Sequence, residues 1–283
     1  MLIKSSRATS FAIIAISYAI AIVVGIIIYH ITPCEYWLKL LVADLSATVV
    51  IFILSVVLDN ASVYDPYWSV LPVAVVILYA LVNGLNPLSL LLLIAVSVWG
   101  VRLTANWAYT FKNLNYQDWR YTMLEKKTKH WYPLINFFGI HLFPTLVVYG
   151  CMLPVVFAFH LELTLNVGSI IFFAVSILAI ILQGASDCQM HKYRKEKATP
   201  FIRCGLWKYS RHPNYLGEIL MWWGVALAFV CACPKLWFLS IGALVNTIMF
   251  LVISIPMADK RQSKKEGFYE YKKQTRILLP IKK

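Results

Sequence analysis

The sequence predicts an all-α, polytopic membrane protein of about seven or eight transmembrane helices, forming a single domain over residues 1–283. Hydrophobic residues make up 60% of the chain and charged residues only 14%, and the mean hydropathy is +0.69. A soluble domain carries roughly 25% charged residues. The net charge of +13 sits in a few blocks between apolar runs, which is typical of cytoplasmic loops and argues against a nucleic-acid partner.

Apolar runs long enough to cross a bilayer, about 20 residues, define the expected helices in chain order. The first run is too long for the core of a signal peptide, so we expect it to remain as a span. The third run has the weakest pattern, because Pro72 interrupts it and Asn83-Gly84 favours an early end. After the last run, residues 259–283 are expected to form an amphipathic helix that ends at Pro280 and turns its lysines toward anionic headgroups or an anionic cofactor. The expected spans are residues 8–31, 41–58, 67–83, 88–110, 133–158, 166–186, 213–232 and 235–257.

The basic residues favour one orientation in the membrane. With eight spans, every lysine and arginine except Lys39, Arg102 and Lys235 falls on the side of the two termini. Basic loops stay in the cytoplasm, so both termini are expected there. Arg102 lies about 12 Å inside the fourth span at a rise of about 1.5 Å per residue, where a charged group indicates a functional site. Asp44, in the second span, has no evident partner and is expected to be structural.

Polar side chains gather in residues 205–218, which read GLWKYSRHPNYLGE. Polar groups at a membrane boundary are costly unless they are paired or used. The proline of this run suits the first turn of a helix, with Ser210 or His212 near its cap. Asn214 and Glu218 then lie on one helical face. This stretch is therefore the first place to expect chemistry.

A second polar stripe ends the sixth span. Gln183, Asp187 and Arg194 are spaced i, i+4 and i+11, so they run from the membrane into the basic loop. Facing the stripe of Asn214 and Glu218, they would form a cytoplasm-facing cleft with a cationic rim. Arginine side chains bind phosphate in a bidentate manner, which favours a dinucleotide phosphate as the occupant. The arginines that would bind it are Arg194, Arg203 and Arg211.

Other enzyme classes lack their signatures in this chain. No GxGxxG run is present, so a nicotinamide site here would not be of the Rossmann type. No HxxxH or HxxHH cluster is present, which argues against a di-iron desaturase or hydroxylase. The six cysteines show no paired metal-ligand spacing, so no metal site is expected. The absence of a GxSxG run argues against an α/β-hydrolase.

At residues 205–218 the sequence resembles the C-terminal signature of the steroid 5α-reductase family, and looks closest to its broad, poorly characterised membrane branch. Residues 117–121, read QDWRY, and the segment from Asp187 to Arg194 also match, as does the tail from Tyr269 to Pro280. The resemblance covers residues 95–283, whereas the first third of the chain matches only in hydropathy.

The resemblance implies a multi-span helical enzyme that uses NADPH to reduce a carbon–carbon double bond conjugated to a carbonyl in a steroid or another lipid. Its partners would be a sterol-like or other lipid substrate and the membrane lipids, and in a eukaryote it would reside in the endoplasmic reticulum. Two features depart from the family pattern: Gln183 replaces an asparagine, and Asp259, Lys260 and Arg261 stand where the family has other tail contacts. The expected cofactor-binding residues are Arg102, Asp187, Arg194, Arg203, Arg211, His212, Asn214, Tyr215 and Glu218.

Catalytic roles follow from the same resemblance. Glu218, together with Asn214, would orient the nicotinamide ring. Tyr64 or Asp65 would donate a proton near the substrate carbonyl and so stabilise the enolate as it forms. His212 would act as a proton relay, a helix cap or a phosphate contact.

Two other interpretations remain. Isoprenylcysteine and phospholipid methyltransferases carry a similar Arg-His-Pro-x-Tyr-x-Gly run, which helps to bind S-adenosylmethionine. The stripe from Asp187 to Arg194 and the DWRY segment favour a reductase over a methyltransferase. A non-catalytic lipid-binding membrane protein that retains the scaffold is the third interpretation.

Overall fold

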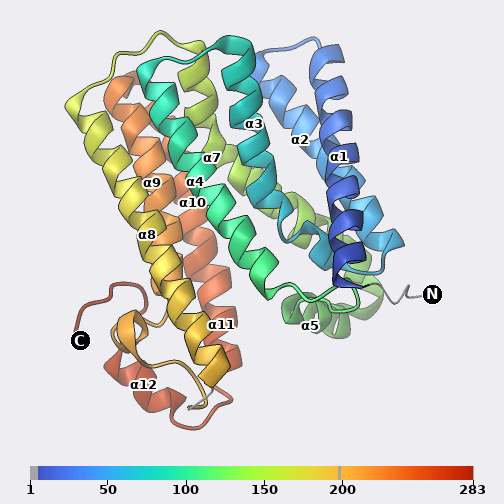
Figure 1. The fold of residues 1–283 in the computed structure, drawn as a ribbon, viewed down its shortest axis with the longest axis vertical. Coiled ribbons are helices and arrows are strands. Elements are labelled where there is room, and N and C mark those ends of the chain that lie inside the picture. Colours follow the sequence, from blue (N-terminus) through green and yellow to red (C-terminus); the bar gives the residue numbers. More distant parts are fainter. Residues whose placement is uncertain (1–5, 197–198, 283) are drawn as a thin grey trace.

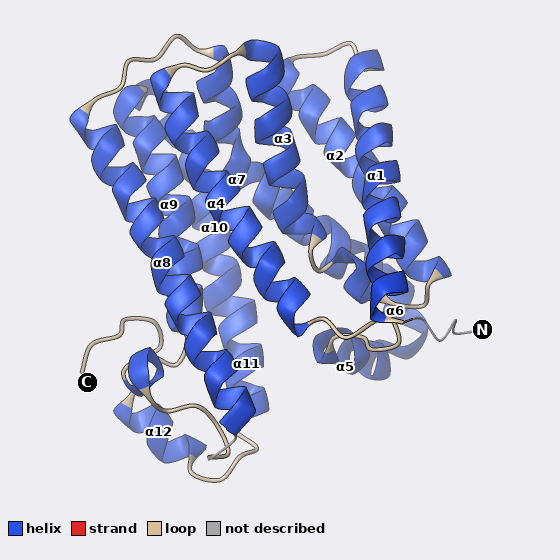
Figure 2. Ribbon diagram, viewed as in Figure 1, coloured by secondary structure: helices blue, strands red, loops and turns tan. Residues whose placement is uncertain are grey.

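The computed structural model describes residues 6–196 and 199–282, and this part of the chain is almost entirely helical (Figures 1 and 2). Eight of its helical runs are long and apolar enough to cross a membrane. The predicted fold class, an all-α polytopic membrane protein, is therefore confirmed. The basic residues Lys4, Lys197 and Lys283, which contribute to the predicted orientation, lie outside the described residues.

The first four spans follow the apolar pattern closely. The third continues through Pro72 and ends where Gly84 adopts a φ of 74°, the left-handed conformation that glycine tolerates. Asn86 then begins the fourth span with a capping box, because its side chain accepts from the Ser89 backbone and the Ser89 hydroxyl accepts in return. The helices are α1 (Arg7–Ile31), α2 (Tyr36–Val57), the short η1 (Ala61–Tyr64), α3 (Tyr67–Asn83) and α4 (Pro87–Thr110).

The fifth span differs from a simple helix because it contains a π-helical segment. It is preceded by α5, which lies across one end of the bundle (Figure 1). The π-helical turn adds a residue to the helix and is frequent at functional sites. The helical elements from α5 to the end of the fifth span are α5 (Trp119–Thr128), η2 (Lys129–Trp131), α6 (Tyr132–Ile135), the π-helical η3 (Asn136–Leu142) and α7 (Phe143–His160).

The sixth and seventh spans, α8 (Val167–Glu196) and α9 (Pro213–Ala232), pack directly against each other. A Cβ atom on Gly217 would lie 2.4 Å from Cγ of Gln183, and one on Gly224 would lie 2.2 Å from Oγ of Ser176. Both glycines are therefore required by the close approach. The same contact leaves no room for a cleft along the apolar stretches of the two helices.

The tail differs from the single amphipathic helix predicted from the sequence. Gly267 adopts a φ of 75° and separates two short helices. After the second helix the chain is extended, and Arg276 forms an isolated parallel bridge with Ser210. The helical elements after α9 are η5 (Pro234–Ser240), α10 (Ile241–Met249), the π-helical η6 (Phe250–Ser254), α11 (Ile255–Gln262) and α12 (Phe268–Gln274).

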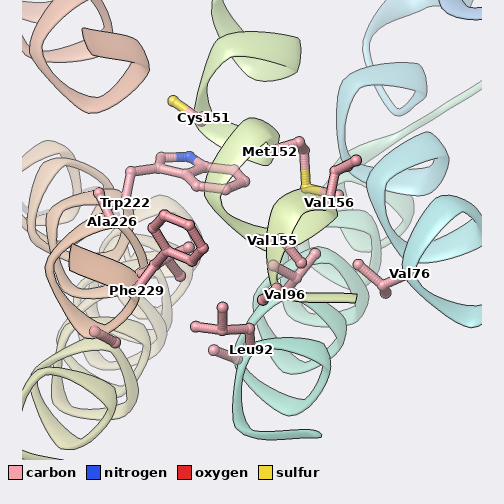
Figure 3. Packing of buried hydrophobic residues seen from close by; sticks show 14 of the residues in the cluster. Val76, Leu92, Val96, Cys151, Met152, Val155, Val156, Trp222, Ala226 and Phe229 are labelled. Atoms are coloured by element: carbon pink, nitrogen blue, oxygen red, sulfur yellow. The ribbon is translucent and has the colours of Figure 1, made fainter. Parts of the chain in front are cut away.

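The main hydrophobic core lies among α4, α7 and α9. Figure 3 shows Trp222 and Phe229 of α9 beside Leu92, Val96 and Val155, which come from α4 and α7. The described ends of the chain lie near the same end of the bundle, together with α5, α11, α12 and the loop before α9 (Figure 1). We call this the basic end, because most of the lysines and arginines belong to these segments.

Candidate functional site

Glu218 is held between two tryptophans inside the bundle. Its carboxylate is 5% exposed and accepts from Nε1 of Trp99 at 2.9 and 3.0 Å and from Nε1 of Trp222 at 3.0 Å. Trp222 is one helical turn after Glu218, whereas Trp99 reaches it from α4. The two indole rings lie 4.8 Å apart, centroid to centroid. The carboxylate therefore has a fixed position and donors on two sides.

Arg102 is paired within the bundle. Its Nη1 donates to Oδ2 of Asp187 at 2.7 Å, and its Nη2 donates to Oε1 of Gln183. The Arg102 and Asp187 side chains are 17% and 16% exposed. This pairing joins α4 to α8 and compensates the charge that the sequence places inside the fourth span. Among the described residues, Nε of Arg102 and Nε2 of Gln183 have no hydrogen-bond partner.

A cavity of about 270 Å³ lies at the basic end, where α8, α9 and α11 meet the loop before α9. Arg102 and Glu218 lie outside its lining, deeper in the bundle, and Arg203 is exposed elsewhere. The cavity is beyond the contact between α8 and α9 rather than between their apolar stretches. The predicted cofactor residues that line it are Asp187, Arg194, Arg211, His212, Asn214 and Tyr215.

Arg211 and His212 line the cavity, but their polar atoms are engaged by Asp259 of α11. His212 Nε2 lies 2.9 Å from Oδ1 of Asp259, and Arg211 Nη2 lies 3.3 Å from its Oδ2. Arg211 also donates from Nη1 to the carbonyl of Thr275 at 2.9 Å. The side chains of Arg211 and His212 are 5% and 8% exposed. These two residues therefore tie the start of α9 to the tail.

The tail completes this arrangement through its backbone. The Arg211 N–H donates to the carbonyl of Arg276 at 3.0 Å, and the Arg276 N–H donates to the carbonyl of Tyr209 at 3.1 Å. The Tyr271 hydroxyl donates to the carbonyl of Trp207, and burial raises the pKa of Tyr271, so its phenol stays neutral. Sequence reasoning missed the role of Asp259. The available signal was that Asp259 is the first acidic residue after Glu218.

Four other polar groups at the cavity lack an ion-pair or hydrogen-bond partner in the described part of the chain. Arg194 and Arg261 have no salt bridge within the described residues, and the Arg261 guanidinium lies 4.2 Å from the ring centroid of Trp119. Oδ1 of Asn214 and Oε1 of Gln262 are buried without a donor among the described residues. The cavity thus combines two uncompensated cations with two amide oxygens that lack donors.

Comparison with known proteins gives the family. The family described as "Protein of unknown function (DUF1295)" matches residues 51–275. The chain belongs to this family. It is also 26% identical to "Uncharacterized protein C594.04c" of Schizosaccharomyces pombe over 245 residues, which cover 76% of this chain and 71% of the relative. No solved structure matches the chain.

The region that matches DUF1295 includes most of the site. Trp99, Glu218 and the whole lining of the cavity at the basic end fall within it. Asp44 lies before it. The structure gives this aspartate the partner that the sequence did not reveal, because the Tyr67 hydroxyl donates to its Oδ1 at 3.1 Å. Pairing across α2 and α3 depends on their packing and has no local sequence signal.

The two predicted proton donors of this DUF1295 protein face different surroundings. Tyr64 is buried, and its hydroxyl lies 2.8 Å from Oγ1 of Thr145. Asp65 accepts from the Tyr121 hydroxyl at 2.6 Å and lies 3.8 Å from Arg120, so it is engaged with α5. Of the two predicted donors, Tyr64 alone lines an internal cavity beside Asp44.

Two neighbouring cavities share lining residues, and Trp68, whose ring centroid is 6.3 Å from that of Trp99, lines the smaller one. The smaller holds about 20 Å³ and is lined by Asp44, Tyr64 and Tyr67, among others. It is large enough for about one water molecule or one polar atom of a ligand. The larger holds about 180 Å³, lies between α1, α2 and α3, and has mainly apolar walls. Asp44 lines both cavities.

Proposed function

We propose that this DUF1295 protein is a membrane reductase that uses NADPH to reduce a carbon–carbon double bond conjugated to a carbonyl in a steroid or another lipid. One observation carries the proposal. Asp187, Arg194 and Asn214, which the motifs resembling the steroid 5α-reductases assign to the cofactor, come from two helices and line the same cavity. A membrane protein that binds no cofactor has no need to bring these three side chains to one cavity.

The residues present fit such a cofactor. Arg194 and Arg261 would hold phosphate groups, because arginine pairs well with phosphate oxygens and these two have no salt bridge in the described part of the chain. Asn214 and Gln262 have amide oxygens free to accept from a carboxamide or ribose hydroxyl. NADPH supplies a hydride when bound. The cavity of about 270 Å³ would enclose part of the dinucleotide, with the remainder against the exposed basic rim.

The residues that would act on the lipid line the two cavities that share Asp44. The apolar cavity between α1, α2 and α3 suits a hydrocarbon skeleton, and the small cavity that shares Asp44 with it has room for a carbonyl oxygen. Asp44 in its protonated form, supported by the hydroxyl of Tyr67, would donate to that oxygen as negative charge develops on it. Asp65 is committed to Tyr121 and Arg120, so the proposed donor site is Asp44 and Tyr67.

The orientation and location are part of the same proposal. The basic end would face the cytoplasm, because lysine and arginine are enriched in cytoplasmic loops. The cofactor cavity opens at that end, where NADPH is available. In a eukaryotic cell the resemblance favours the endoplasmic reticulum.

Methyl transfer is a second candidate that one observation favours. The cavity at the basic end is small for a whole dinucleotide and closer to the size of a single nucleoside. The Arg-His-Pro run that resembles the methyltransferase motif also lies at this cavity. The two candidates therefore predict different ligands for the same place, and a binding experiment separates them.

The test measures thermal unfolding of the protein in lipid nanodiscs with NADPH, NADH or S-adenosylmethionine. We expect NADPH to stabilise the protein by about 2.7 kcal/mol at a concentration 100 times its Kd. Arg194→Ala should lose this stabilisation. Lys192→Ala, a neighbouring exposed residue outside the cavity, should retain it.

Stabilisation by S-adenosylmethionine in place of NADPH would establish the methyltransferase interpretation against ours. Stabilisation by neither would favour a lipid-binding protein without catalysis. An equal response of wild type and Arg194→Ala to NADPH would place the nucleotide elsewhere.

A further inference from the structure

An unbroken series of hydrogen bonds leads through the bundle to Asp44. Tyr64 contacts Thr145 at 2.8 Å, Thr145 contacts Thr48 at 3.0 Å, and Thr48 donates to the Tyr67 hydroxyl at 3.5 Å. Tyr67 in turn donates to Oδ1 of Asp44 at 3.1 Å. These side chains come from η1, α7, α2 and α3 and are all buried. We call them the hydroxyl chain.

The hydroxyl chain has a direction. A carboxylate only accepts, so Tyr67 must donate to Asp44, and the Tyr67 oxygen then accepts from Thr48. Thr48 can accept from Thr145, and Thr145 from Tyr64, since either hydroxyl of each pair can be the donor. Every group then donates toward Asp44. Such an arrangement lets each hydroxyl pass its proton forward while it receives another from behind, and its members polarise one another.

Both ends of the hydroxyl chain line the small cavity, but of the two only Asp44 also lines the apolar cavity. Asp44 thus lies at the cavity in which we place the hydrocarbon part of the lipid. Tyr64 lies at the basic end of its helix, next to Asp65, whose side chain is 16% exposed. The hydroxyl chain therefore runs from η1, where Tyr64 precedes a partly exposed aspartate, to Asp44 inside the membrane-spanning region.

We propose that the hydroxyl chain loads Asp44 with the proton that the lipid substrate takes up, which rests on the reductase function proposed above. Reduction of the double bond adds one hydride and one proton to the substrate. Asp44 gives up the proton, Tyr67 replaces it, and Thr48, Thr145 and Tyr64 restore their neighbours in turn. Tyr64, which is buried, would regain a proton from water that reaches η1 beside the partly exposed Asp65, so one proton moves from water to substrate and no electrons move along the hydroxyl chain.

The test measures how fast the Asp44 carboxyl proton exchanges with D₂O. The infrared carbonyl stretch of the protonated group is assigned by its loss in Asp44→Asn, with the full protein in nanodiscs and no nucleotide. Thr145→Val keeps the shape of the side chain but removes its hydroxyl, and should slow the exchange by about tenfold or more. Thr145→Ser should restore it.

A matched control and a second break make the result specific. Thr104→Val removes a hydroxyl that contacts Ser69 at 2.9 Å outside the hydroxyl chain, and should leave the exchange rate unchanged. Thr48→Val breaks the hydroxyl chain one residue away and should act as Thr145→Val does. Interhelical hydroxyl pairs also serve as packing contacts in membrane proteins, but loss of packing alone is not repaired selectively by serine.

The outcomes separate this proposal from the proposed function. Equal exchange in wild type, Thr145→Val and Thr48→Val would overturn the hydroxyl chain as a proton path. The proposal would also be overturned if no protonated carboxyl signal disappeared in Asp44→Asn, because Asp44 would then have no proton to deliver. Slowed exchange in both valine variants, in a protein that NADPH does not stabilise, would support the path and refute the reductase.

Discussion

Asp259→Asn should release the tail from the basic end without unfolding the bundle. The substitution keeps the size of the side chain but removes the charge that compensates Arg211 and contacts His212, whose side chains are 5% and 8% exposed. Removing one partner of a buried ion pair costs roughly 3–5 kcal/mol, because the other charge stays buried without compensation. The tail can detach instead, so the cost should appear as local opening of α12 and the bridge at Arg276.

A loss of about 3 kcal/mol corresponds to roughly a 150-fold rise in the open population. Hydrogen exchange read by mass spectrometry on peptides covering residues 268–277 should therefore quicken by about two orders of magnitude. The core peptide of α9 around Phe229 should keep its wild-type rate. Glu196→Gln is the matched control, because it breaks an exposed pair with Lys192 that contributes well under 1 kcal/mol.

Tail exchange within about threefold of wild type would contradict the reasoning, since that corresponds to less than about 0.7 kcal/mol. It would mean that the backbone bridge and the Tyr271 contact hold the tail without Asp259. A global loss of thermal stability equal to the local one would also contradict it. In that case the tail and the bundle would unfold as one unit.

Three further substitutions test the packing, the buried pair and the pH dependence. Gly242→Ala should destabilise the protein by about 1–3 kcal/mol in thermal unfolding, because the new Cβ would lie 2.1 Å from a backbone carbon of α7, whereas Gly25→Ala meets only ordinary contacts and should be neutral. Arg102→Met should cost roughly 3 kcal/mol by leaving Asp187 unpaired, and the double variant with Asp187→Leu should recover most of it. Tyr271→Phe should remove about 1 kcal/mol near neutral pH. Since burial raises the pKa of Tyr271, the unfolded chain loses this proton first as pH rises through about 10. The wild type should therefore lose stability above that pH, whereas the Phe variant should not show this loss.

The spans were predictable because apolar length is a local property of the chain. The helix α9 begins at Pro213 and α3 ends before Gly84, as the proline and glycine signals indicated. The π-helical segments were not predictable, since an inserted residue leaves the apolar pattern intact. The helical extension of α8 to Glu196 was also missed, because a polar helix end beyond the membrane resembles a loop.

Site residues were predicted one by one, but their pairing was not. Sequence reasoning placed Asp187 and Asn214 at the cofactor site, and the structure brings both to one cavity. It treated Arg211 and His212 as free for a ligand, whereas Asp259 occupies their polar atoms. Contacts between segments some 50 residues apart depend on the packing of whole helices, which spacing along the chain does not encode.

The bridge between Ser210 and Arg276 has a consequence for biosynthesis. Asp259 lies near the end of the eighth apolar helical run and Arg276 follows that run, so both leave the ribosome after the first seven runs have been made. Until then Arg211 and His212 lack the carboxylate that contacts them at the start of α9. The first seven apolar helices can therefore be made before the cavity has taken shape, and a translation product cut short just after Gln262 would have all eight apolar helical runs but lack Phe268 and Tyr271 of the cavity lining.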